Sequence, residues 1–148
     1  LWLTPLLQAI HILMIGIVFI SVLMVVLRIQ GSVRADEPFN QTWARFAPWV
    51  KWALVVMAAT GIVLCIGEPV REVSALSFWL KMGLILVGVL GLLGLRRAAS
   101  GVTGSTMPGG VRLAAVALLV VWIAIIYLGR AIAYDAEVWG SWSLGVYA

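Results

Sequence analysis

Long apolar runs dominate this chain and are separated by short polar links. The runs cover roughly residues 6–27, 47–66, 75–95 and 111–134, and each is close to the ~20 residues that an α-helix needs to cross ~30 Å of hydrocarbon. None shows the two-residue alternation of a barrel strand, and a helix in lipid satisfies its own backbone hydrogen bonds. The pattern therefore predicts an all-α integral membrane protein, built as a four-transmembrane-helix bundle.

The composition fits a membrane protein of one domain. Hydrophobic residues make up 64% of the 148 positions and charged residues 11%, whereas about a quarter of the residues in an average soluble domain are charged. We therefore expect residues 1–148 to form a single transmembrane domain that ends in an aromatic tail over 135–148. The first run is too long for a cleaved signal peptide, and the chain lacks an initiator methionine, so we expect further residues upstream of Leu1.

The charges in the links predict the orientation. Basic side chains gather in the link after the first run and in the link between the third and fourth runs; they are Arg28, Arg34, Arg45, Arg96, Arg97 and Arg112. By the positive-inside rule both of these links are cytoplasmic, and both termini are periplasmic in a bacterial inner membrane. The net charge of +4 comes from these separate arginines and not from a basic tract, so we expect no nucleic-acid partner.

Ionisable side chains also lie within the apolar runs. His11, Lys81 and Arg130 share a depth of roughly 6 to 10 Å below the outer surface, at 1.5 Å per residue. Charged groups inside a membrane cost several kcal/mol and so indicate function. They predict a polar pocket near the periplasmic face, to which we add the flanking residues Gln8, Tyr127 and Tyr134. The alternative is that Lys81 and Arg130 anchor the helices at the interface, while His11 makes only a hydrogen bond across the bundle.

Four stretches carry a resemblance to a known family: "PLLQAIHILMIGIVF", "RFAPWVKWALVVMAATGIVL", "FWLKMGLILVG" and "WIAIIYLGRAIAY". Together they resemble the uncharacterised bacterial four-helix membrane family catalogued as domain of unknown function 6644. The resemblance implies the fold and the orientation, and it implies no established activity. A looser similarity to the copper-resistance D type of membrane protein and to small b-type cytochromes rests on architecture alone.

The polar pocket leads us to expect a small membrane subunit that binds haem b or quinone in an electron-transfer context. His11 would be an axial haem ligand or a hydrogen-bond donor to a quinone carbonyl, and Lys81 and Arg130 would neutralise haem propionates or a semiquinone. The chain has one histidine, whereas a transmembrane b-type haem commonly takes two. A methionine, Met57 or Met82, or the histidine of a second copy would then supply the other ligand.

Two other functions stay open. In a copper-handling protein His11, Cys65 and Met82 would bind the metal, since imidazole, thiolate and thioether suit Cu(I), although Lys81 and Arg130 nearby disfavour a cation. In a non-catalytic accessory subunit of a larger membrane complex, the partners would be the lipid bilayer and other membrane subunits or further copies of the chain. We do not expect an enzyme, because the sequence contains no catalytic constellation.

Overall fold

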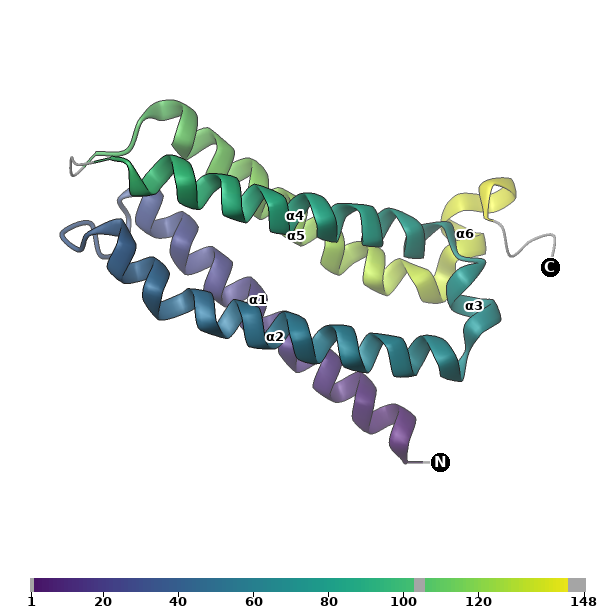
Figure 1. Cartoon of the computed structure of the whole chain (residues 1–148). Coiled ribbons are helices and arrows are strands. Elements are labelled where there is room, and N and C mark those ends of the chain that lie inside the picture. Colours follow the sequence, from purple (N-terminus) through teal and green to yellow (C-terminus); the bar gives the residue numbers. More distant parts are fainter. Residues whose placement is uncertain (1, 103–105, 144–148) are drawn as a thin grey trace.

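The computed structural model describes residues 2–102 and 106–143, and every element in these ranges is helical. Four long helices make up the fold: α1 (Leu3–Gln30), α2 (Phe39–Gly67), α4 (Leu76–Ser100) and α5 (Gly109–Ala131) (Figure 1). The short elements are α3 (Pro69–Val73), α6 (Asp135–Trp139) and two 3-10 turns, Ile132–Tyr134 and Gly140–Trp142. All four long helical segments are long and apolar enough to cross a membrane.

The two ends of the bundle differ. The links after α1 and after α4 lie together at one end, which we call the loop end, and the N-terminus, α3 and α6 lie at the other, the terminal end (Figure 1). Because both links that carry the arginines are at the loop end, that end of the bundle is strongly basic. The terminal end holds the acidic residues Glu68, Glu72, Asp135 and Glu137.

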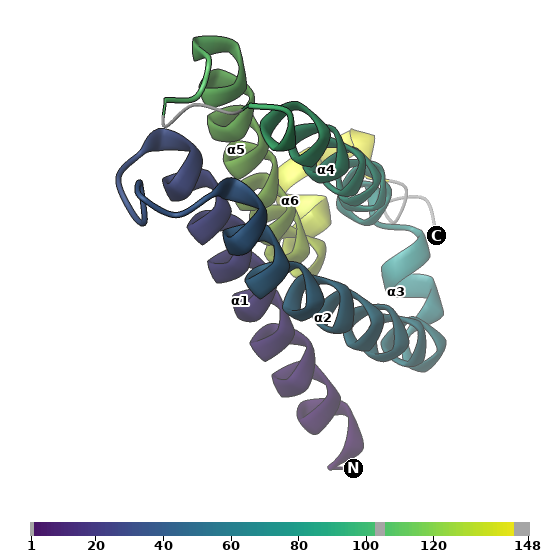
Figure 2. The ribbon, with the colours of Figure 1, turned by 60° about the vertical axis from the view of Figure 1, so that its left-hand side comes forward.

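The packing is closest at the middle and loop end of the bundle. Helix α1 packs against both α2 and α5, and α4 packs on α5, whereas α2 and α4 touch at few points. The core is formed by valines of α1 such as Val18 and Val22 together with Met57 of α2 and Trp122 of α5. Figure 2 shows the first turns of α1 projecting away from α4 and α5, and most side chains from Trp2 to Ala9 are accordingly exposed.

Glycines allow α4 and α5 to approach closely. A Cβ added at Gly91 would lie 3.0 Å from Cδ1 of Leu118, and one added at Gly88 would lie 3.3 Å from the ring of Trp122. Small residues serve this role in membrane helices, where lipid is as apolar as the core and close packing holds the helices together. A Cβ at Gly83 or Gly94 would meet nothing within 4 Å, so these two glycines are outside the contact.

The helices extend beyond the apolar runs that predicted them. Helix α2 begins at Phe39, directly after Pro38, and continues through Pro48, whereas the apolar run begins near residue 47. Helix α1 ends where Gly31 adopts a left-handed conformation with φ of 78°, the usual glycine termination of a helix. The predicted tail is folded as far as Ser143, and residues 144–148 of that tail lie outside the described residues.

Candidate functional site in the terminal half of the bundle

A hydrogen bond between His11 and Thr60 joins α1 to α2. Nδ1 of His11 lies 2.8 Å from Oγ1 of Thr60, the imidazole is half-buried and the threonine is buried. The ring lies over Gly61, where an added Cβ would be in ordinary van der Waals contact with Cε1 of His11, at 3.5 Å. The single histidine of the chain is therefore held in one orientation between two of the long helices.

We infer from the hydrogen bonds of the Thr60 hydroxyl which imidazole nitrogen carries the proton. Its one hydrogen is shared between the carbonyl oxygens of Val56, at 2.9 Å, and Met57, at 3.1 Å. This back-bonding to the preceding turn is common for threonine in helices. Since the hydroxyl hydrogen is used in this way, Oγ1 accepts from Nδ1–H of His11, and Nε2 of the neutral ring keeps its lone pair.

Lys81 of α4 brings a positive charge to the same place. Its side chain lies across Gly129 of α5, where an added Cβ would be 3.4 Å from Nζ and 3.6 Å from Cε. The ammonium group interacts electrostatically with His11 and with Glu72 of α3. Each of the four long helices thus contributes one residue to a cluster that we call the four-span site: His11, Thr60, Lys81 and Gly129.

A hollow of about 180 Å³ lies one helical turn from the four-span site towards the terminal end. It is formed between the first turns of α1 and the end of α2, and its polar lining comes from Thr4, Gln8, Glu68 and Glu72. Gln8 is three residues before His11, and Glu72 is the carboxylate that interacts with Lys81. The hollow is therefore close to the four-span site on its terminal side, although none of the four residues of that site lines it.

The remaining predicted residues lie elsewhere. Arg130, Tyr127 and Tyr134 have exposed side chains on α5 and the turn after it, and Met82 is exposed on α4. Met57 is buried, one turn from Thr60. Cys65 is five residues beyond Thr60 and therefore about 140° around α2 from it, at 3.6 residues per turn. Among the described residues no group of three or more His, Cys, Asp and Glu side chains is arranged to hold a metal ion.

Sequence reasoning missed Thr60 and Gly129. Thr60 carries the one hydroxyl between residues 53 and 66 of a long apolar run, and a buried hydroxyl in such a run is a signal for an interhelical hydrogen bond. Gly129 gives no comparable signal, because its role depends on the path of the Lys81 side chain.

The folded tail caps the first turn of α4 at the terminal end of the bundle. This turn begins at Leu76, five residues before Lys81. The carboxylate of Asp135 accepts hydrogen bonds from the backbone N–H groups of Leu76, at 3.0 Å, and Ser77, at 2.9 Å. It also accepts from the hydroxyl of Ser143, at 2.6 Å, while the indole of Trp139 donates to Oγ of Ser77 at 2.8 Å. Asp135 acts as an N-cap supplied from a distant part of the chain, which fixes the start of α4 and hence the position of Lys81.

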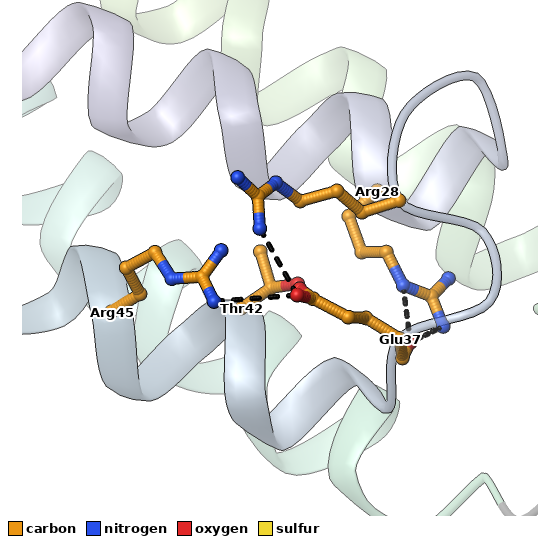
Figure 3. Close-up of polar contacts among 5 residues, drawn as sticks. Arg28, Glu37, Thr42 and Arg45 are labelled. Atoms are coloured by element: carbon orange, nitrogen blue, oxygen red, sulfur yellow. Dashed lines mark hydrogen bonds and ion pairs between the residues drawn. The ribbon is translucent and has the colours of Figure 1, made fainter.

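A separate ion cluster fixes the link between α1 and α2 at the loop end (Figure 3). Arg28 is only 3% exposed and donates from Nε, at 2.8 Å, and from Nη2 to the backbone carbonyl of Glu37. The Glu37 carboxylate forms salt bridges with Arg34, at 3.0 Å, and Arg45, at 3.3 Å, and accepts from Thr42. Because these contacts all join the link to its two helices, we interpret the cluster as structural.

The comparisons with known proteins give the family of the chain and no ligand for this site. Neither the curated proteins nor the solved structures include a match to this chain. The family model of the Family of unknown function (DUF6644) matches residues 3–135, a range that contains the four long helices and every residue of the four-span site. The protein therefore belongs to this family.

Proposed function

We propose that the protein is a small integral membrane subunit that binds the head group of a quinone at the four-span site, in an electron-transfer context. The observation that carries this proposal is the imidazole of His11, whose Nδ1 bonds to Thr60 and whose Nε2 is left for a ligand, beside the ammonium of Lys81. A quinol hydroxyl can donate to the lone pair of Nε2, and a quinone oxygen can accept from Lys81. The positive charge of Lys81 also favours the negative charge that a quinone ring gains on reduction.

The size of the adjacent hollow favours a quinone over a haem. Pockets for small molecules and cofactors typically enclose ~300 to 1,000 Å³, and this hollow, at about 180 Å³, is smaller than that range. A single ring whose isoprenoid tail stays in lipid needs less enclosed space than a porphyrin. Copper is disfavoured because the positive charge of Lys81 lies within electrostatic reach of the imidazole that would be the ligand.

The basic loop end supports an orientation with both links in the cytoplasm and both termini in the periplasm of a bacterial inner membrane. In that orientation the four-span site and the hollow lie in the periplasmic half of the bilayer. Electrons would pass between the quinone and a redox centre on another subunit, so the chain would act as part of a larger membrane complex. The exposed first turns of α1 offer apolar surface for lipid or for such a subunit.

The test is equilibrium binding of a short-chain ubiquinone or menaquinone analogue to the full chain in mild detergent. We expect saturable binding by the wild type that weakens by about tenfold or more in His11→Phe, since a lost hydrogen bond of ~1.4 kcal/mol corresponds to a factor of ten. Tyr127→Phe is the matched control, because Tyr127 is 65% exposed and lies outside the four-span site.

Two results would overturn the quinone proposal. Equal binding by the wild type and His11→Phe would assign any uptake to partition into the detergent. An absorbance spectrum with a Soret band, and with α and β bands that sharpen on reduction by dithionite, would assign His11 to haem.

A further inference from the structure

An apolar groove of about 550 Å³ runs between α4 and α5 in the loop-end half of the bundle. Its lining residues extend from Val87 to Ala98 on α4 and from Gly110 to Val121 on α5, and all of them are aliphatic or glycine. Towards the loop end from the tight contact at Gly91, the glycines that line the groove have open space around them. A Cβ added at Gly94 or Gly110 would meet nothing within 4 Å.

The length of the groove fits one leaflet of a bilayer. From Val87 to Ala98 a helix rises about 17 Å, at 1.5 Å per residue, which is close to half of the ~30 Å thickness of the hydrocarbon. A transmembrane helix of a partner would need a surface that continues along the whole span. In the other half, however, α4 and α5 are closed against each other by Trp122 over Gly88 and by Lys81 across Gly129. The groove therefore suits an extended acyl chain.

Positive charges at the loop end of the groove favour a lipid with an anionic head group. Arg97 lies in the last turn of α4, three residues after the lining residue Gly94 and therefore next to it on the helix surface, and its exposed side chain has no hydrogen bond or ion pair among the described residues. The neighbouring Arg96 differs, because its guanidinium lies 5.4 Å from the ring of Trp43. The first N–H groups of α5, which receive no side-chain cap, add a positive end of a helix dipole at the same mouth.

We propose that the groove holds an acyl chain of an anionic phospholipid from the leaflet at the loop end, with the phosphate at Arg97. Anionic lipids are attracted to basic residues at this level of a membrane, and the groove supplies apolar contacts that an ordinary helix surface lacks. This inference rests on the membrane insertion proposed above, and it is independent of quinone binding at the four-span site.

The experiment counts phospholipids retained by the full chain. The protein is equilibrated in nanodiscs that contain phosphatidylglycerol and phosphatidylcholine with the same acyl chains, transferred to mild detergent and analysed by native mass spectrometry. We expect the wild type to retain phosphatidylglycerol and Gly94→Leu, which fills the groove, to lose it. Gly83→Leu is the matched control, because a Cβ at Gly83 also meets nothing within 4 Å but lies outside the groove.

A second pair of variants tests the head group. Arg97→Gln should reduce the preference for phosphatidylglycerol over phosphatidylcholine by about fivefold, the factor that corresponds to one basic residue near an anionic surface. Arg96→Gln should leave that preference unchanged, since Arg96 lies over Trp43.

Two outcomes would overturn the lipid assignment. Equal lipid retention by Gly94→Leu and Gly83→Leu would show that the groove holds no lipid, and a dimer that dissociates only in Gly94→Leu would assign the groove to a second copy. His11→Phe distinguishes this inference from the quinone proposal, because it should weaken quinone binding by about tenfold or more and leave lipid retention unchanged.

Discussion

Replacing Thr60 by valine removes the hydroxyl that joins α2 to α1 while the shape of the side chain is kept. The wild-type hydrogen bond is 2.8 Å long and its acceptor is buried, so the variant leaves Nδ1–H of His11 without its partner. Interhelical hydrogen bonds in membrane proteins contribute ~0.6 kcal/mol on average and up to ~1.7, and an orphaned buried donor costs ~1 to 3 kcal/mol. We expect Thr60→Val to lower the free energy of unfolding by about 1 to 2 kcal/mol.

The assay is reversible unfolding in mixed micelles as the mole fraction of a denaturing detergent rises, followed by tryptophan fluorescence. The expected loss corresponds to a change of about 5- to 30-fold in the folding equilibrium. Thr60→Ser is the control, because serine keeps the hydroxyl and should keep most of the stability.

A double-mutant cycle with His11→Phe assigns the effect to the hydrogen bond. If the bond is the cause, Thr60→Val should cost less than about 0.5 kcal/mol when the imidazole is already absent, since the interaction energy is then lost in either single variant. An equal cost of Thr60→Val in the presence and absence of His11 would refute the reasoning, because it would show that Thr60 stabilises only its own helix.

The remaining predictions concern packing, capping and orientation. Gly88→Leu should lower the free energy of unfolding by about 1 to 3 kcal/mol through overpacking against the ring of Trp122, and unfolding at the wild-type midpoint would contradict the close contact. Asp135→Ala should cost about 0.5 to 2 kcal/mol and speed amide hydrogen exchange in the first turn of α4; unchanged exchange there would show that the carboxylate does not cap α4. In a Cys65→Ser background, Ser100→Cys should react with a membrane-impermeant maleimide only after cells are permeabilised, and reaction on intact cells would reverse the proposed orientation.

Much of the fold could be predicted from the sequence, because hydropathy over about twenty residues is a strong signal for a helix of membrane length. All four apolar runs lie on long helices. The ends of α1 and α2 could not be predicted, because a helix can continue through polar residues outside the apolar run, and α2 does so from Phe39 onwards. The cap formed by Asp135 was equally hidden, because it depends on how the tail folds back over α4.

The candidate site could be predicted in part. The depths of His11 and Lys81 follow from their positions in the runs, and the structure brings these two residues within electrostatic reach of each other. The rotation of each helix could not be read, because lipid-facing and core-facing surfaces are equally apolar. Tyr127 and Arg130 share a face of α5, but the face turned towards the core is the one with Trp122, Ile125 and Leu128.

The most direct test of the account is ¹⁵N NMR of the full chain in lipid, with histidine as the only labelled residue. Since the chain contains one histidine, the spectrum reports His11 alone. The account predicts that the neutral ring carries its proton on Nδ1, and that a quinol analogue shifts the unprotonated Nε2 in the wild type. A proton on Nε2 with an unprotonated Nδ1, or an Nε2 signal that a quinol leaves unchanged, would contradict it.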